Sequence, residues 1–87
     1  NLSRELAAEW GRRGVRVNAL CPGYFPTEMT EEMFADEGSL RWLRRKTILG
    51  RGGADHELDG ALLYLASDAS TYVTGQALIV DGGFTAI

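Results

Sequence analysis

The stretch from Cys21 to Thr27 carries residue types that could build a binding surface. A short apolar run ends there in Pro22 and Gly23, and two aromatic residues, a second proline and a threonine follow. Proline fixes the backbone turn, and glycine has no side chain to hold a ligand away from the backbone. This composition is typical of a corner against which a flat group can lie. The simpler alternative is that Pro22 and Gly23 only turn the chain and that Phe25 fills core.

Few other residues have a spacing that suggests chemistry. His56 is the only histidine and has no companion ligands at a useful distance, so we expect no metal site. Cys21 is expected to be a small buried hydrophobic residue, because no histidine or helix N-terminus is placed to activate it. The acidic pairs indicate a solvated helix face rather than paired-carboxylate catalysis: Glu31 with Glu32, and Asp36 with Glu37.

Composition sets the class of protein. The chain has 87 residues, of which 45% are hydrophobic and 24% charged, as in ordinary globular domains. The net charge of −3 argues against a large basic surface for nucleic acid. No apolar run has the length of a membrane span, and a single cysteine cannot form an internal disulfide. We therefore expect one compact unit in the cytoplasm, without nucleic-acid or membrane partners.

The beginning of the chain is predicted to be a helix that is already under way. Its apolar residues recur at i, i+4 and i+8, namely Leu2, Leu6 and Trp10. Gly11 and Gly14 are expected to end it, and Asn1 is its only available N-cap. Because the sequence enters this helix so early, we expect the chain to be the tail of a longer protein.

Two short strands and three more helices are predicted downstream. Residues 15–21 are apolar enough for a strand buried on both faces of a parallel sheet, and residues 77–80 predict a second strand. Residues 28–36 turn helical, Gly38 is expected to break that helix, and Ser39 to cap the next one. A longer helix is predicted over residues 54–66, with acidic residues in its first turn and a core-facing stripe: Leu58, Ala61, Leu62, Leu65 and Ala66.

This order of elements defines the expected fold. Strand, helices and strand form a βαβ unit, which joins parallel strands by a right-handed crossover. We predict an α/β fold, the C-terminal part of a doubly wound parallel sheet of Rossmann type. A sheet of two strands is marginal by itself, which again favours missing sequence upstream.

Taken together, these segments resemble the C-terminal third of the short-chain dehydrogenase/reductase family. "RGVRVNALCPGYFPTEM" is similar to the family's sixth strand and its Pro-Gly corner, and "LGRGGADHELDGALLYLASDASTYVTGQALIVDGG" to its last helix and strand. The resemblance covers essentially the whole chain. It implies that residues 1–87 are the C-terminal portion of a single Rossmann-type domain that uses NAD or NADP.

The resemblance also assigns cofactor residues at the Pro-Gly corner. Ligands of doubly wound sheets bind outside the carboxyl ends of the strands, where this corner lies. By resemblance, the backbone of Phe25 and the hydroxyl of Thr27 hold the nicotinamide carboxamide and the nearby phosphate. Pro22 and Gly23 complete this cofactor-binding set.

Residues 28–47 lie where the family has its substrate lid. Methionine and aromatic side chains suit a surface that adapts to a ligand. The substrate-side candidates are Tyr24, Met29, Met33, Phe34 and Trp42. The alternative, that these side chains pack the short helices onto the body, is equally open at this point.

Catalytic residues are expected to lie upstream. The family's phosphate-binding glycines and its catalytic serine, tyrosine and lysine precede the matching region. Tyr24, Tyr64 and Tyr72 are not followed four residues later by lysine, so none of them can replace the catalytic tyrosine. We therefore expect the complete enzyme to be active and this part alone to be inactive.

The resemblance implies hydride transfer between a nicotinamide cofactor and a small alcohol or ketone, such as a sugar acid or polyol. A 3-ketoacyl substrate is the runner-up, and a non-catalytic binding or oligomerisation module of the same fold is the alternative. In the family the last helix and strand lie at a subunit interface. A homo-oligomer is therefore expected, with Leu62, Tyr64 and Val80 as interface candidates beside their ordinary role in the core.

The basic run "RWLRRK" at residues 41–46 leaves three alternatives open. It is most often a solvated helix face in an acidic protein. With Trp42 interleaved it also resembles a small nucleic-acid patch. If the lid faces the substrate, one of Arg41, Arg44 and Arg45 could pair with a substrate carboxylate.

Overall fold

The computed structural model describes residues 1–86. They form two compact units. The first comprises residues 1–21 and 59–79, and the second comprises residues 22–58 together with the segment from residue 80 onward. Within residues 1–86, no helix combines the length and apolar character needed to cross a membrane.

The first unit begins with helix α1, Leu2–Trp10. The Asn1 side chain accepts a hydrogen bond of 2.9 Å from the Ser3 N–H, which confirms Asn1 as the N-cap. A 3₁₀ turn, η1 (Gly11–Arg13), follows, and its end is marked by Gly14 with φ of 84°. Gly11 keeps a right-handed conformation, so the chain leaves the helical path only at Gly14, where a left-handed residue is needed.

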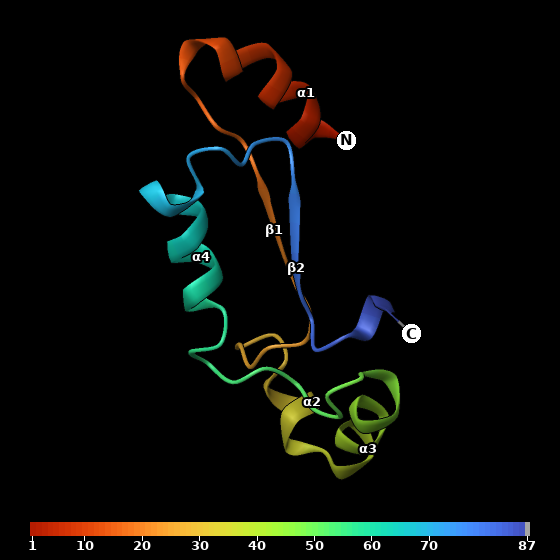
Figure 1. The fold of residues 1–87 in the computed structure, drawn as a ribbon. Coiled ribbons are helices and arrows are strands. Elements are labelled where there is room, and N and C mark those ends of the chain that lie inside the picture. The colour runs from red at the N-terminus through yellow and green to blue at the C-terminus, as the bar shows by residue number, and fades with distance from the viewer. Residues whose placement is uncertain (87) are drawn as a thin grey trace. The chain divides into compact units, whose positions relative to one another are not determined.

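The two strands are β1, Ala19–Pro22, and β2, Ala77–Val80. They pair in one two-stranded sheet, and Figure 1 shows them running in the same direction. The second strand has the predicted bounds, whereas the first is shorter than the predicted residues 15–21. The backbone N–H of Val17 donates to the Thr74 hydroxyl at 3.0 Å, and the N–H of Gln76 donates to Asn18 Oδ1 at 3.0 Å. Side chains thus replace part of the backbone ladder that a longer strand requires.

Helix α4, Asp59–Ala66, also lies in the first unit. It starts later than the predicted residue 54, so Asp55 and Glu57 lie in turns rather than in its first turn. The Glu57 side chain instead accepts from the Ala54 N–H at 2.9 Å and pairs with Arg51, which favours a local turn over helix. A 3₁₀ turn, η2 (Asp68–Ser70), follows α4.

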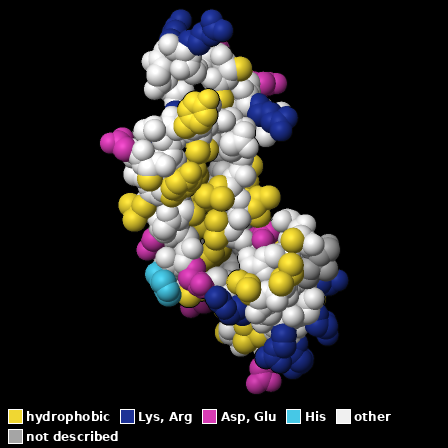
Figure 2. All heavy atoms as spheres, viewed as in Figure 1, with side chains coloured by type: hydrophobic (Ala, Val, Ile, Leu, Met, Phe, Trp, Pro, Cys, Tyr) yellow, Lys and Arg dark blue, Asp and Glu magenta, His cyan; other side chains and the backbone are white. Residues whose placement is uncertain are grey.

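The first unit leaves apolar side chains uncovered, contrary to three predictions: the core-facing stripe that includes Leu62, the strand buried on both faces and the buried cysteine. Leu62 and Leu63 of α4 are 59% and 67% exposed, and Ile79 of β2 is 52% exposed. Cys21 is exposed as well, so neither a doubly buried strand nor a buried cysteine is observed. Figure 2 shows hydrophobic side chains gathered over the strands and α4. A doubly wound sheet has helices packed on both of its faces. The described residues of this unit do not supply both helical layers.

The second unit contains helices α2, Glu31–Ala35, and α3, Glu37–Lys46. Both predicted helices are present, but the predicted boundary between them is wrong. Asp36 rather than Ser39 is the N-cap, because its carboxylate accepts from the Ser39 N–H at 2.8 Å. Gly38 therefore lies in the first turn of α3 and breaks no helix.

The centre of the second unit is formed at the end of α3. Leu43 has no exposed surface, and Thr47 is only 6% exposed. The Thr47 hydroxyl donates to the Leu43 carbonyl at 2.8 Å and accepts from the Arg51 N–H at 3.0 Å. A last 3₁₀ turn, η3 (Phe84–Ala86), belongs to the same unit. These contacts fix the segments that flank the predicted site.

Candidate functional site

The Pro-Gly corner closes against the segment after β2. The Gly23 N–H donates to the Val80 carbonyl at 2.9 Å. A Cβ atom placed on Gly23 would lie 2.6 Å from Asp81 Cβ and 2.7 Å from Asp81 Cα. Glycine is therefore required here for a close approach of two backbone segments. The predicted approach of a flat ligand to Gly23 stays a prediction beside this structural reason.

Phe25 is held by both its ring and its carbonyl group. A Cβ atom on Gly53 would overlap the Phe25 ring, so the ring packs directly on that glycine. The Phe25 carbonyl accepts from the Thr30 hydroxyl at 2.6 Å. This geometry supports the packing alternative for the ring, while a role of the Phe25 backbone toward a carboxamide stays a prediction.

Thr27 lies in an exposed turn that Thr30 organises. The Thr27 N–H donates to Thr30 Oγ1 at 2.8 Å, and the two hydroxyl oxygens are 3.2 Å apart. The Thr30 N–H in turn points to Thr27 Oγ1 at 3.3 Å. Sequence reasoning missed Thr30, although threonine hydroxyls can bond to nearby backbone groups in turns. The Thr27 side chain is thus held in an exposed turn, and its role toward a phosphate stays a prediction.

A surface hollow of about 440 Å³ lies beside this corner. Three of the predicted substrate-side residues line it together with two residues of α3: Tyr24, Met33, Trp42, Gly38 and Ser39. The other two candidates do not. Phe34 packs its ring against Gly52, and Met29 is 96% exposed and does not line the hollow. Whether the hollow binds a substrate stays a prediction.

Two rings of an aromatic cluster, those of Tyr24 and Trp42, line the hollow. The Tyr24 and Trp42 rings are perpendicular, with centroids 5.6 Å apart. Phe84 contacts both rings, at 5.5 Å from Tyr24 and 5.9 Å from Trp42. These are favourable edge and tilted geometries for aromatic pairs. Phe84 was missed because it is distant in sequence from its partners and belongs to no periodic element.

A smaller cavity, of about 100 Å³, lies in the same unit. Eleven residues line it: Tyr24, Phe25, Thr47, Leu49, Arg51, Gly52, Gly53, Glu57, Val80, Asp81 and Gly82. Arg51 and Glu57 form a two-pronged ion pair there, with Nη2 to Oε2 at 3.0 Å. The hydrogen bond from Arg51, and that from the Ala54 N–H, lower the pKa of Glu57 to about 2. This carboxylate is therefore committed to holding its own loop.

Two other carboxylates in this unit are ionised more readily than usual. The pKa of Asp81 is lowered, first by the Thr85 hydroxyl and then by the Thr85 N–H. The pKa of Asp36 is lowered by the Ser39 N–H and hydroxyl, with a smaller effect of Arg41. Each shift comes from capping a turn or a helix. None of these groups is tuned toward proton transfer near neutral pH.

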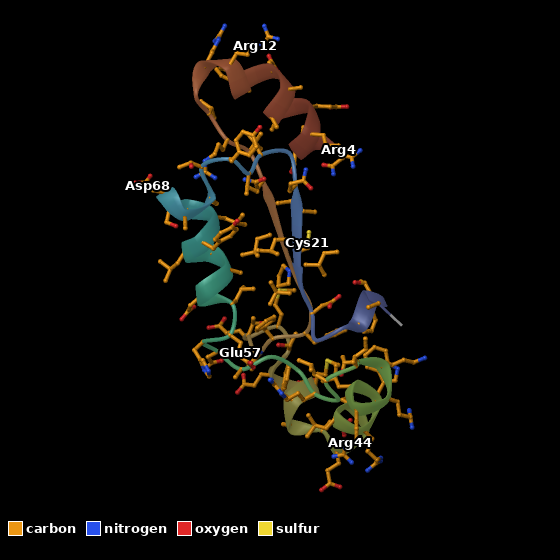
Figure 3. All side chains as sticks on the ribbon, viewed as in Figure 1. Arg4, Arg12, Cys21, Arg44, Glu57 and Asp68 are labelled. Atoms are coloured by element: carbon orange, nitrogen blue, oxygen red, sulfur yellow. The ribbon has the colours of Figure 1, made fainter. Side chains whose placement is uncertain are left out.

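The possible metal ligands and the basic residues of α3 are the remaining candidates from the sequence. Within residues 1–86, no group of three or more histidine, cysteine, aspartate or glutamate side chains could hold a metal ion. The basic residues of α3 are exposed, and Figure 3 shows Arg44 pointing away from the helix. Arg41 alone lies near the hollow, with Nη2 3.7 Å from where a Gly38 Cβ would stand. The three alternatives for this cluster stay open.

Comparison with known proteins identifies the family. Residues 1–85 match the family model described as enoyl-(acyl carrier protein) reductase. Gluconate 5-dehydrogenase of Gluconobacter oxydans is 52% identical over 85 residues, which are 98% of this chain and 33% of that protein. Galactitol 2-dehydrogenase (L-tagatose-forming) of Cereibacter sphaeroides is 52% identical over 84 residues, covering 97% and 33%. The chain belongs to the short-chain dehydrogenase/reductase family, as the resemblance predicted.

Solved structures confirm the fold class. A gluconate 5-dehydrogenase from Burkholderia cenocepacia in complex with NADP and tartrate matches with a TM-score of 0.92 and 44% identity, over 99% of this chain and 34% of that one. A 4-hydroxyisoleucine dehydrogenase complexed with NADH matches with a TM-score of 0.93 and 32% identity, over 99% and 35%. The fold is therefore part of an α/β Rossmann fold. The chain spans about a third of the length of the curated relatives it matches.

Proposed function

We propose that this chain is the C-terminal portion of an NAD(P)-dependent oxidoreductase that transfers a hydride between the cofactor and a small polyhydroxylated alcohol or ketone. The observation that carries the proposal is the 52% identity to a gluconate 5-dehydrogenase over 98% of the chain. The catalytic serine, tyrosine and lysine would lie in the part of the parent protein that precedes these residues, so this portion alone would be inactive.

The cofactor proposal concerns the Pro22–Thr27 corner. The oriented, exposed hydroxyl of Thr27 fits a phosphate oxygen, since hydroxyl groups donate well to charged acceptors. The chain at Phe25 is fixed through its carbonyl, which would keep the adjacent backbone in place for a carboxamide. When bound, the nicotinamide would supply the hydride-transfer chemistry. One structural relative is a complex with NADP and another a complex with NADH, so the proposal includes both cofactors.

The substrate proposal favours sugar acids and polyols over 3-ketoacyl groups. Relatives named for gluconate, galactitol and 5-keto-D-gluconate support this choice. The lid segment, residues 28–47, would cover the substrate. The substrate would contact Met33 and Trp42 of the lid and Tyr24 before it, all of which line the hollow. Closing a lid excludes water from the path of the hydride. A homo-oligomer and a cytoplasmic location are further parts of the proposal.

The experiment starts from the complete parent protein. Binding of NAD(H) and NADP(H) is measured by titration, and oxidation of gluconate and galactitol by absorbance of the reduced cofactor. Thr27→Val should weaken cofactor binding about tenfold, because one hydrogen bond to a charged phosphate is lost. Thr71→Val, an exposed threonine in the first unit, is the matched control and should bind normally.

The alternative function predicts a different result. A non-catalytic binding or oligomerisation module would show no turnover with any sugar acid, polyol or 3-ketoacyl substrate. Absence of both turnover and cofactor binding in the complete protein would overturn the proposal. Cofactor binding without turnover would favour a chemically silent relative of the same fold.

A further inference from the structure

We propose that Phe84 is a positioning residue that holds Tyr24 and Trp42 as the aromatic wall of the hollow and thereby sets its fit to a polyhydroxylated substrate. The proposal rests on the proposed function for the identity of that substrate. Its structural part concerns only the second unit, to which all three aromatic residues belong. It uses Tyr24 of the Pro22–Thr27 corner but none of the four predicted cofactor residues, Pro22, Gly23, Phe25 and Thr27.

The first step is the contact itself. Within the described residues, Phe84 has the only ring that contacts both Tyr24 and Trp42, with centroid distances of 5.5 Å and 5.9 Å. Tyr24 comes from the chain after β1 and Trp42 from α3, so their own contact joins two separate segments. Phe84 adds a third segment to this contact. Removing it would leave two rings that support each other alone.

The second step is that the turn carrying Phe84 is built in advance. Asp81 accepts from the Gly83 N–H at 2.9 Å, from the Thr85 N–H at 3.0 Å and from the Thr85 hydroxyl at 2.7 Å. Gly83 has φ of 92°, and a Cβ atom on it would lie 2.6 Å from Ile48 Cβ. The turn therefore presses closely on the chain that leaves α3. The position of Phe84 is therefore set by the hydrogen bonds of Asp81 to the residues on either side of it, as well as by the packing of its own ring.

The third step is the chemistry of the hollow. Aromatic rings offer an apolar surface for the C–H groups of a sugar or polyol. Ser39 Oγ donates to Asp36 Oδ2 at 2.9 Å, so its oxygen keeps lone pairs that can accept from a substrate hydroxyl. A wall of rings beside a hydroxyl acceptor suits a molecule with alternating C–H and O–H groups. The spacing of that wall decides which chain length and stereochemistry fit.

The test compares three variants of the complete parent protein, and a fourth serves only to assign an NMR signal. Phe84→Leu keeps apolar volume but loses the ring, and Phe84→Tyr keeps the ring. Tyr72→Leu removes an aromatic ring that is fully exposed in the first unit and serves as the matched control. For each variant, KM for gluconate and galactitol, KM for the cofactor, and the fluorine NMR signal of fluorotryptophan at Trp42 are measured. The Trp42 signal is assigned by its loss in Trp42→Phe.

Phe84→Leu should raise substrate KM about fivefold or more without changing cofactor KM, and should shift the Trp42 signal. Phe84→Tyr should restore both, and Tyr72→Leu should change neither. An unchanged substrate KM, or an equal loss in substrate and cofactor KM, would overturn the proposal. If the parent protein has no activity, the proposed function fails separately. The Trp42 signal then decides the contact: a shift supports positioning by Phe84, and no shift overturns it.

Discussion

Different kinds of contact stabilise the interior of each of the two units. In the first unit, polar groups do much of the work: the Arg16 guanidinium donates to the carbonyls of Leu65, Ser67, Ser70 and Val73. Large apolar side chains of that unit remain open to solvent. The second unit contains a wholly buried leucine, Leu43, and close contacts of aromatic rings with glycines and with one another.

The difference indicates which unit has an apolar surface left to be covered. A contiguous exposed apolar surface in a folded protein usually marks a contact with something else. The first unit has such a surface on α4 and β2. The second unit also exposes Met29, Ile48 and Leu49, but its three clustered aromatic rings pack on one another. The predicted cofactor corner and the hollow both belong to the second unit. Predicted binding residues are thus placed where the chain fixes its own geometry.

Deleting the buried leucine should have the largest effect on stability. Leu43→Ala removes a side chain with no exposed surface and should lower the free energy of unfolding by about 2–5 kcal/mol. Leu40→Ala, on the same helix but 38% exposed, is the matched control and should cost clearly less. Urea unfolding of the complete parent protein measures both. Equal losses would contradict a self-packed second unit.

Arg16 tests the polar framework of the first unit. Its guanidinium donates to Ser70 O at 2.9 Å, to Ser70 Oγ at 3.0 Å and to Leu65 O at 3.2 Å. Arg16→Ala should cost about 1.5–3 kcal/mol, because several carbonyls at the end of α4 lose a charged donor. Arg12→Ala, which changes an exposed arginine of η1 labelled in Figure 3, should cost almost nothing. A small effect of both variants would show that the unit is held by packing instead.

Two glycines give opposite predictions for the two units. Gly23→Ala should destabilise by about 1–3 kcal/mol, because the added Cβ meets Asp81 backbone at 2.7 Å. Gly60→Ala in α4 meets nothing within 4 Å and should stabilise by about 0.5–1 kcal/mol, since alanine favours helix. Thermal unfolding of the two variants gives the sign of each change. Destabilisation by Gly60→Ala would mean that α4 is covered closely by another surface.

The smallest expected effect is the loss of stability at acid pH that comes from the Arg51–Glu57 ion pair. Glu57 has its pKa lowered from 4.5 to about 2 by Arg51 and the Ala54 N–H. A lowered pKa in the folded state stabilises the protein above the unfolded-state pKa. That contribution is therefore lost as pH falls from 4.5 toward 2. Because this ion pair is solvent-exposed, we expect a small effect that added salt reduces further.

Glu57→Gln should remove this part of the acid dependence while leaving the rest of the pH profile unchanged. The measurement is urea unfolding at a series of pH values for the parent protein and the variant. The carboxylates of Asp36 and Asp81, whose pKa values are also lowered, remain in both proteins and serve as the internal reference. Parallel curves for the two proteins across the acid range would contradict a stabilising role of the Arg51–Glu57 pair.

Local signals in the sequence determined much of the fold. The helix at residues 2–10, its Asn1 cap and the strand at residues 77–80 follow from periodicity and capping chemistry, which act between neighbours in the chain. The family and the α/β class followed from motifs at fixed distances. These features need no knowledge of distant contacts.

Tertiary structure decided the features that depend on distant partners. The late start of α4 and the shortened β1 arise where side chains such as Glu57 and Asn18 compete for backbone groups. The requirement for Gly23 comes from Asp81, far along the chain. Phe84, also distant in sequence, contacts both Tyr24 and Trp42, which line the hollow. Periodicity reports which face of an element is apolar. Only the folded chain determines which other segment meets that face, because that depends on contacts between residues distant in sequence.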